Sequence, residues 1–346
     1  MLSVNQSLNL LFGSMFPTST QKNYWIFGSE SELNKLRENA NKAFIKRHIN
    51  RVQGIKDDKS NYFLNSNEER LLVKFYEIKM RDFCRRFTPQ MPKPVIGTAF
   101  HYLKRFYLNN SVMDYHPKEM LITCVYLACK VEEFNVSIKQ FVANVKGDLE
   151  KATDIILNNE LLLMQHLNYQ LTIHNPYRPI EGLLIDLKVR SNLSDPDRLR
   201  PTIEDFIDRL FLTDASLLYS PAQLALAAVL HSASKNQENL DAYVTETLLG
   251  KNNGLQYLKD LIEAVRKIRT FLVKNVETPS RDQIKYIEKR LEICRNEETN
   301  PDSEVFKQKL QEMLFRDDKA DDISYQAEPT TSQNGIEKIM QELPSI

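Results

Sequence analysis

Apolar positions along this chain recur at helical spacing, and in one stretch they leave almost no polar face. From 120 to 131, Met, Leu, Cys, Val and Ala side chains occupy nearly every side of the predicted helix, and charged residues follow abruptly at its end: Lys130, Glu132 and Glu133. Pro117 suits the first turn of this helix, where its missing N–H is not needed. A helix with so little polar surface belongs at the centre of a bundle. Its charged end is the feature that needs a function.

Capping signals predict further helices on both sides of this stretch. Three pairs have the spacing of a capping box, in which two side chains satisfy backbone N–H groups at a helix start: Ser29 with Glu32, Ser66 with Glu69, and Ser280 with Gln283. Residues 1–28 are predicted to be a mobile N-terminal tail. From about residue 300 the chain becomes polar, so 300–346 are predicted to be a disordered tail.

The chain also contains an internal repeat. Segments 102–117 and 206–221 align without gaps, so each position in the second lies 104 residues after its counterpart. Four positions are identical: Arg105/Arg209, Leu108/Leu212, Tyr115/Tyr219 and Pro117/Pro221. A second nearly all-apolar stretch, 224–230, follows in the same register. Amphipathic helices can align by chance, but a shared corner with Tyr and Pro in register favours two repeated bundles, each around one apolar helix.

Composition narrows the class of protein further. Only 9 glycines occur among 346 residues and few segments alternate apolar with polar residues, which favours an all-α fold. Basic and acidic residues both total 46, so the chain lacks the basic surplus typical of nucleic-acid binding. The cysteines form no C-x-x-C pair and are predicted to be core residues in a reducing compartment. No apolar run approaches the ~20 residues that a membrane span needs.

Motifs for catalysis or cofactor binding are missing from the sequence. No P-loop, kinase Gly-rich loop, H-E-x-x-H or G-x-S-x-G occurs, and the six histidines show no metal-ligand spacing. We therefore expect no catalytic residue, no cofactor and no metal site. The pattern is typical of a protein that acts by binding another protein.

Several motifs resemble the cyclin family. Leu-Ala-Cys-Lys-Val-Glu-Glu at 127–133 is similar to the end of a cyclin-box helix, and Asn-Glu-Leu-Leu-Leu at 159–163 is similar to the fifth helix of the first box. The motifs at 102–107 and 175–179 resemble those of the transcriptional branch, and the run 105–117 resembles the cyclins of the CDK-activating kinase. The likeness covers about residues 24–295.

The resemblance implies two tandem cyclin-box bundles of about five helices each, flanked by an N-terminal and a C-terminal helix. The expected parts are an N-terminal helix with its link at 29–59, a first box at 60–174, a second box at 175–276 and a C-terminal helix at 277–299. The segment around Asn175-Pro-Tyr-Arg-Pro179 is rich in helix breakers and is the expected boundary between the boxes.

The resemblance also implies a function. Cyclins of this branch are regulatory subunits, not enzymes, that activate a cyclin-dependent kinase, and the expected partners are the kinase catalytic subunit, the RING-finger assembly factor of the CDK-activating complex, and the core of transcription factor IIH. Such a complex phosphorylates kinase activation loops and the RNA polymerase II tail in the nucleus, without direct contact to nucleic acid or membrane. The alternatives are a cyclin C-like protein, a transcription-factor-B-like DNA-binding module, and an unfamiliar helical enzyme.

Six residues are the expected kinase-binding site. In the family, the residues matching Lys130 and Glu160 contact the αC helix region of the kinase, and apolar side chains surround them; the full set here is Lys130, Val131, Glu160, Met164, Tyr169 and Leu171. On pattern alone, Lys130 and Glu160 would be an ordinary surface pair, worth little. The repeat places Ser234 at the position of Lys130, so only the first bundle carries this site.

The chain departs from the family at two places. Cell-cycle cyclins dock substrates through a Met-Arg-Ala-Ile-Leu patch, whereas the comparable region here, 69–75, reads Glu-Arg-Leu-Leu-Val-Lys-Phe, which argues against such docking. The tail lacks Lys-rich clusters, so nuclear import is expected to depend on partners. The segment beginning at Met15 resembles the usual start of the family, so translation from Met15 is an alternative to Met1.

Overall fold

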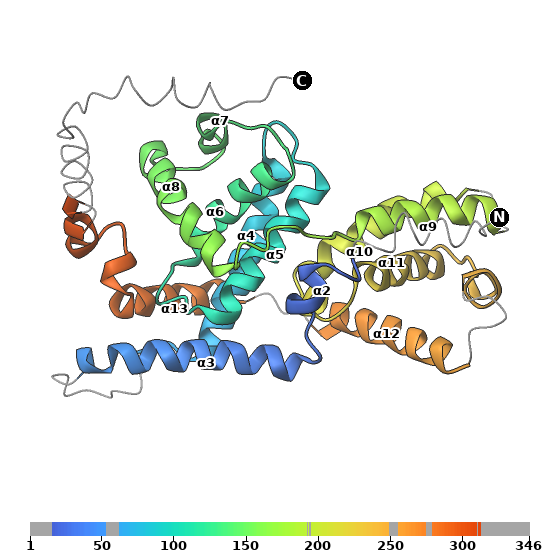
Figure 1. Cartoon of the computed structure of the whole chain (residues 1–346), viewed down its shortest axis with the longest axis horizontal. Coiled ribbons are helices and arrows are strands. Elements are labelled where there is room, and N and C mark those ends of the chain that lie inside the picture. Colours follow the sequence, from blue (N-terminus) through green and yellow to red (C-terminus); the bar gives the residue numbers. More distant parts are fainter. Residues whose placement is uncertain are drawn as a thin grey trace, which may run out of the picture. The chain divides into compact units, whose positions relative to one another are not determined.

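The computed structural model describes residues 16–52, 62–248 apart from 192 and 194, 255–274, 279–309 and 311–312. Within these ranges every regular element is helical, which confirms the predicted all-α class (Figure 1). The chain forms two compact units, Met1–Asn296 and Glu297–Ile346. The start at Met15 lies outside the described residues.

The first bundle is built around the apolar helix that dominates the sequence pattern. Its members are α4 (Ser66–Arg86), α5 (Lys93–Asn109), α6 (Pro117–Val131), α7 (Ile138–Val142) and α8 (Leu149–His166). The central helix α6 packs against α4, α5 and α8. Its Cys124, Val125 and Ala128 are completely buried. The absence of a polar face on α6 thus reflects neighbours on most of its sides.

The second bundle repeats this arrangement. Its α-helices are α9 (Tyr177–Arg190), α10 (Arg200–Leu210), α11 (Pro221–Lys235) and α12 (Leu255–Lys274). Shorter helical segments join them: η3 (Pro196–Leu199), η4 (Asp214–Leu217) and the π-helical η5 (Tyr243–Leu248). The central helix α11 packs against α9, α10 and α12. Since α6 and α11 both have 15 residues and start and end 104 residues apart, the predicted repeat is confirmed.

The two central helices also end in the same way. The N–H of Phe134 donates to the carbonyl of Cys129 at 2.8 Å, and the N–H of Glu238 donates to that of Ala233 at 2.8 Å. Each bond spans a residue in the left-handed region, Glu133 (φ 56°) in α6 and Gln237 (φ 60°) in α11. This is the Schellman motif, usually built on glycine. The two ends correspond residue for residue at the same 104-residue offset.

The N-terminal region is more ordered than predicted. The expected mobile tail over residues 1–28 is wrong for α2 (Thr20–Trp25), which Ser19 caps by accepting from the N–H of Lys22. The helix has six residues and would not be stable alone, so tertiary packing holds it. Trp25 is 4% exposed and belongs to a small cluster with Leu33, Leu108 and Leu217.

The predicted capping boxes differ in outcome. Ser280 with Gln283 forms a complete box at the start of α13 (Arg281–Cys294), which packs against α4. At the start of α3 (Glu30–His48), the side chain of Ser29 accepts from the N–H of Glu32, while the carboxylate of Glu32 accepts from the N–H of Gly28. The helix α3 continues into the short η1 (Ile49–Val52).

The predicted box at Ser66 and Glu69 is wrong by one residue. Asn65 caps α4 together with Glu68, because the Asn65 side-chain oxygen reaches two backbone N–H groups. Glu69 is instead buried and accepts from the hydroxyl of Ser111. Burial raises the pKa of Glu69 to about 7, against the lowering effect of its hydrogen bonds.

The second unit contains helical structure within the predicted disordered tail. A short helical turn, η6 (Glu297–Thr299), precedes residues 304–309, which are also helical. An ion pair of 3.1 Å joins Lys309 to Glu298. The prediction of disorder from residue 300 is therefore wrong for 304–309, and residues 313–346 lie outside the described part.

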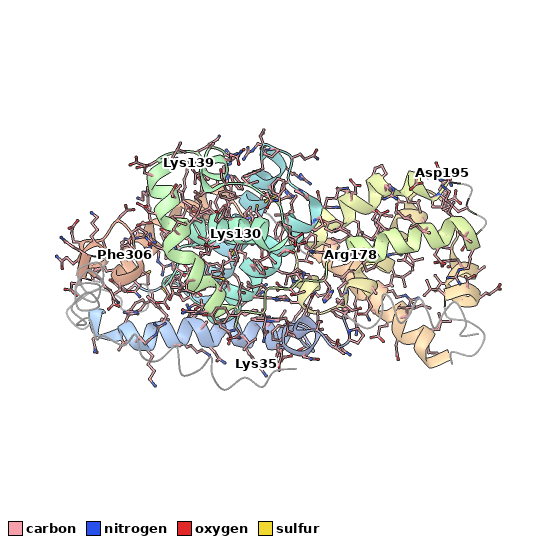
Figure 2. The ribbon with its side chains drawn as sticks, turned by 45° about the horizontal axis from the view of Figure 1, so that its top comes forward. Lys35, Lys130, Lys139, Arg178, Asp195 and Phe306 are labelled. Carbon is pink, nitrogen blue, oxygen red and sulfur yellow. The ribbon has the colours of Figure 1, made fainter. Side chains whose placement is uncertain are left out.

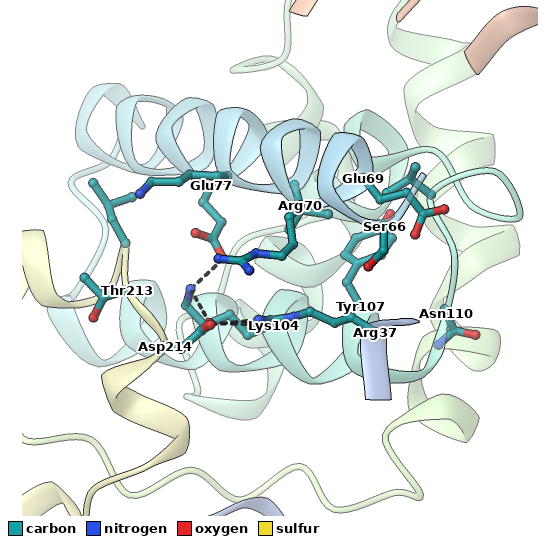
Figure 3. Close-up of a pocket in the computed structure, with 14 residues that line it drawn as sticks. Arg37, Ser66, Glu69, Arg70, Glu77, Lys104, Tyr107, Asn110, Thr213 and Asp214 are labelled. Carbon is teal, nitrogen blue, oxygen red and sulfur yellow. Dashed lines mark hydrogen bonds and ion pairs between the residues drawn. The ribbon is translucent and has the colours of Figure 1, made fainter. Parts of the chain in front are cut away.

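A buried charge cluster joins the N-terminal helix, the first bundle and the second bundle (Figure 3). Nζ of Lys104 on α5 lies 2.6 Å from Oε1 of Glu77 on α4 and 3.9 Å from Oδ1 of Asp214 in η4. Arg37 of α3 donates two bonds of 2.8 Å to the same Asp214 carboxylate. Burial opposes ionisation of Asp214, but the charge and hydrogen bonds of Arg37 hold its pKa below the ordinary value. The cluster ties the two bundles to each other and to α3.

Candidate functional site

The charged end of α6 reaches the surface, as the sequence pattern predicts. The side chain of Lys130, labelled in Figure 2, is 52% exposed, and its Nζ lies 2.5 Å from Oε1 of Glu160 on α8. The same ammonium lies 5.7 Å from the ring centre of Tyr126, one turn earlier. The glutamate side chain is only 14% exposed, so it anchors the more exposed lysine. An ammonium carries three N–H donors, and this contact uses one of them.

The direction of the α6 end is fixed from the side by α5. The hydroxyl of Thr98 donates to Glu132 at 2.6 Å and accepts from Nδ2 of Asn175 at 3.0 Å. Gly97 makes this approach possible, because a Cβ there would lie 2.2 Å from Oδ1 of Asn175. The segment that links the two bundles thereby supports the helix end that presents Lys130.

Two exposed leucines of α8 lie close in sequence to Glu160. Leu157 is 53% exposed and Leu161 is 55% exposed, on either side of Glu160 in sequence. The buried face of the same helix is carried by Ile156 and Leu163, which are fully buried. The sequence analysis did not select Leu157 and Leu161. Leu157 and Leu161 are four residues apart and therefore lie on one side of α8, away from the buried positions. A second apolar side on a helix is the sequence feature that could have identified them as an exposed apolar surface.

The loop after α8 presents Tyr169. This residue is 60% exposed and has a left-handed backbone with φ 56°. Its N–H donates to the carbonyl of Met164 at 2.9 Å. The hydroxyl of Tyr102 donates to the carbonyl of Leu171 at 2.6 Å. The conformation that exposes the tyrosine is thus held by bonds on both sides.

The six expected site residues fall into three groups. Lys130 and Glu160 are in direct contact. Val131, Met164 and Leu171 are half-buried and pack against the core. Tyr169 stands in solvent on the adjoining loop. The structure therefore places a charged pair beside partly exposed apolar side chains.

The described residues contain neither a metal-ligand cluster nor a helix that could span a membrane. Among the described residues, no group of three His, Cys, Asp or Glu side chains has an arrangement that could hold a metal ion. None of the described helices has the length and apolar character needed to cross a membrane. All four cysteines are free and buried, which confirms that they are core residues.

Comparisons with protein families give the class of this protein. The Cyclin, N-terminal domain model matches residues 45–172, and the Cyclin C-terminal domain model matches residues 175–273. A model of the Mlp lipoprotein family matches residues 227–334, a span that begins inside α11 and overlaps the cyclin C-terminal domain. The two cyclin matches cover the two bundles, and the chain belongs to the cyclin family.

Within that family the chain is a homologue of cyclin-H. It is 43% identical to Cyclin-H of Xenopus laevis over 82% of this chain and 88% of that protein. It is 31% identical to Cyclin-H1-1 of Arabidopsis thaliana over 83% of this chain and 90% of that protein. These relatives are matched over most of their length, so the likeness concerns whole proteins.

Solved structures agree on the fold. A chain in the Chaetomium thermophilum CAK complex bound to ATP-gamma-S matches with a TM-score of 0.70 and 24% identity, covering 96% of this chain and 99% of that one. A chain in the yeast TFIIK (Kin28/Ccl1/Tfb3) complex matches with a TM-score of 0.53 and 21% identity, covering 74% of this chain and 100% of that one. At these identities the likeness establishes the fold alone.

Proposed function

We propose that this chain is the cyclin of a CDK-activating kinase complex and that it activates the kinase by binding it through the end of α6 and the exposed side of α8. The observation that carries the proposal is the Lys130–Glu160 pair at the surface of a homologue of cyclin-H, with exposed Leu157 and Leu161 on the same helix as Glu160. The proposed kinase-binding residues are Lys130, Val131, Glu160, Met164, Tyr169 and Leu171, extended by Leu157 and Leu161.

The mechanism follows from the rigidity of the surface. A free kinase of this class keeps its αC helix swung out, so the Lys–Glu ion pair over ATP is not formed. A partner that binds only the swung-in state shifts the population toward it by its differential affinity. The ends of α6 and α8 are held in place by hydrogen bonds and form a surface of this kind. Because this surface does not deform, it cannot also bind the kinase with αC swung out.

Each part of the surface has a separate role in this binding. The two remaining N–H donors of Lys130 can bond backbone carbonyls of the kinase, while Glu160 keeps the ammonium oriented. Leu157 and Leu161 supply apolar surface, worth roughly 25 cal/mol for each Å² removed from water. Burial around the ion pair would exclude water and strengthen its electrostatic contacts.

The test is kinase binding by matched variants of the full chain. Lys130→Ala or Glu160→Ala should weaken binding of the purified kinase catalytic subunit by about 2–5 kcal/mol, because each change leaves one charge of an interface pair without its partner. Ser234→Ala, at the equivalent position of α11, should bind like the wild type. Calorimetric titration measures the difference, and equal affinities for all four proteins would refute the proposed surface.

The wider setting belongs to the same proposal. Partners would be the kinase catalytic subunit, the RING-finger assembly factor and the core of transcription factor IIH, and the complex would act in the nucleus. We place the boundary between the boxes at residues 174 and 175, where Asn175 bonds back to Thr98. Co-purification with mass spectrometry of the bound proteins tests this setting, and recovery without any kinase would contradict it.

The cyclin C-like alternative has weaker support. The RNA polymerase II holoenzyme cyclin-like subunit of Aspergillus clavatus is 31% identical over 61% of this chain, against 43% over 82% for the Xenopus Cyclin-H. The kinase recovered by co-purification distinguishes the two alternatives, because each type of cyclin would select its own catalytic subunit.

A further inference from the structure

A buried cation without an acidic partner lies behind the proposed kinase-binding loop. Arg105 of α5 is completely buried, and within the described part of the chain no carboxylate forms an ion pair with it. Its Nη1 donates to the carbonyl of Gln170 at 3.2 Å, while Nε and Nη2 have no hydrogen-bond partner. The guanidinium carbon Cζ of Arg105 lies 4.7 Å from the ring centre of Trp25.

This arrangement is expensive in free energy. Removing a charge from water is strongly unfavourable unless hydrogen bonds and counter-charges replace the solvent. Burial accordingly lowers the pKa of Arg105 to about 9. One carbonyl and one aromatic face compensate only part of the loss. An apolar side chain of similar length would be expected to fit this place at lower cost.

The repeat shows that the helix itself does not require the burial. The equivalent Arg209 of α10 is exposed and pairs with Asp205 one turn earlier, at 2.8 Å. Both arginines occupy the same position of the repeated segment. The ring of Trp25 and the carbonyl of Gln170 contact the first arginine, whereas the second bonds Asp205 of its own helix.

The residues that cover Arg105 also hold the loop after α8. The indole Nε1 of Trp25 donates to Oε1 of Gln170 at 2.6 Å. Gln21, one turn earlier on α2, accepts from the N–H of His174 at 2.6 Å and donates to its carbonyl at 3.3 Å. The loop is therefore tied to α2 at both ends. Tyr169 immediately precedes Gln170.

The helix α2 is itself anchored to the second bundle. The N–H of Phe27, just after α2, donates to the carbonyl of Leu217 at 2.8 Å. Figure 1 shows α2 at the junction between the helices of the two bundles. The N-terminal segment thus reaches the first-bundle loop, the buried arginine and the second bundle together.

We propose that Arg105, Trp25 and Gln170 form a positioning unit that holds residues 169–174 in the conformation needed to bind the kinase. The inference rests on the proposed function and deepens it. Tyr169 occupies the left-handed region, which is unfavourable for a side chain with a Cβ, so the loop keeps this shape only while its other bonds over-determine it. Arg105 donates to the backbone carbonyl of Gln170, and Trp25 donates to the side-chain oxygen of the same residue.

The decisive variant is Arg105→Met in the full chain, with Arg209→Met as the matched control. Met fills the same space without a charge, so the melting temperature should stay equal or rise. Affinity for the kinase catalytic subunit should nevertheless fall about tenfold, because the loop must be ordered again on binding. Hydrogen exchange at the amides of 170–174 should become faster in Arg105→Met only. Trp25→Phe keeps a ring over the guanidinium but removes the donor to Gln170, and should lose less affinity.

The outcomes separate this inference from the proposed function. If the wild type fails to bind the kinase, the proposed function is overturned and the inference with it. If the wild type binds and Lys130→Ala weakens binding, but Arg105→Met binds normally, only the positioning unit is refuted. If Arg105→Met loses melting temperature and affinity together, with faster exchange throughout the first bundle, the arginine is merely structural and the inference is wrong.

Discussion

The two central helices α6 and α11 are alike in length, burial and ending, yet only one presents a charged pair to solvent. Both start with proline and both end in a Schellman motif on a residue with positive φ. At the last turn, Lys130 of α6 contacts Glu160, whereas α11 has an exposed serine, Ser234. The shared features build a bundle, and the differing residues give the two helix ends different surfaces. A repeat can thus conserve a fold while its copies diverge at the surface.

The largest expected difference between the copies concerns the buried charge of α5. Lys104→Ala would leave buried Glu77 without its ion-pair partner, while Asp214 keeps Arg37, and should lower the free energy of unfolding by about 3–5 kcal/mol. The equivalent residue of α10 is Asp208, whose partially exposed pair with Arg85 is worth about 0.2–1 kcal/mol. Urea denaturation of Lys104→Ala and Asp208→Ala measures both, and equal losses would contradict the asymmetry.

The central helices should contribute equally to stability. Met120 and Leu224 are equivalent and are 1% and 2% exposed. Met120→Ala and Leu224→Ala should each cost about 2–5 kcal/mol, from lost burial and the cavity left behind. Denaturant titration of the two variants provides the comparison. A loss confined to one of them would show that the second copy of the helix is not the centre of its bundle.

The turns that precede α6 and α11 should differ in how their contribution to stability depends on pH. Ser111 donates to buried Glu69, and the equivalent residue in the second corner is Ala215. The pKa of Glu69 is about 7 in the folded chain against an ordinary 4.5, mainly because of burial. The folded state therefore holds a proton that the unfolded state releases, so the stability from this group is present at low pH and is lost as pH rises toward 7.

Glu69→Gln removes this dependence. Relative to the wild type, the variant should gain up to about 3 kcal/mol of stability between pH 4.5 and pH 7, since each pKa unit corresponds to about 1.4 kcal/mol. Chemical denaturation at several pH values measures the difference. A constant difference across this window would mean that Glu69 titrates normally in the folded chain.

The smallest expected effect is shared by both copies. Glu133 and Gln237 adopt positive φ without being glycine. Glu133→Gly and Gln237→Gly should each stabilise the chain by about 0.5–1 kcal/mol, because glycine has no Cβ to oppose this backbone. Thermal unfolding of the two variants tests this, and a loss of stability in either would show that its side chain makes a contact that outweighs the strain.

The structure brings Lys130 and Glu160 into contact, and their role in kinase binding stays a prediction. Lys130 was recognisable because a charge ends an apolar helix, and family resemblance supplied Glu160. Leu157 and Leu161 were not selected, because the sequence alone does not distinguish an exposed leucine on an amphipathic helix from a buried one. Arg105 was identified only as an aligned residue of the repeat. Its burial depends on α2, which carries too few residues to signal a helix by itself.

Most of the longer helices, the repeat and the two bundle centres could be predicted from the sequence, because they depend on the local order of apolar residues and on caps within a few positions. The tertiary structure alone decided that Arg105 is buried while Arg209 is exposed, that Asp214 faces Lys104, and that α2 forms at all. Each of these outcomes depends on segments far apart in the chain coming into contact. Identical residues at equivalent positions of the repeat can therefore differ in burial, because burial depends on which distant segments pack against them.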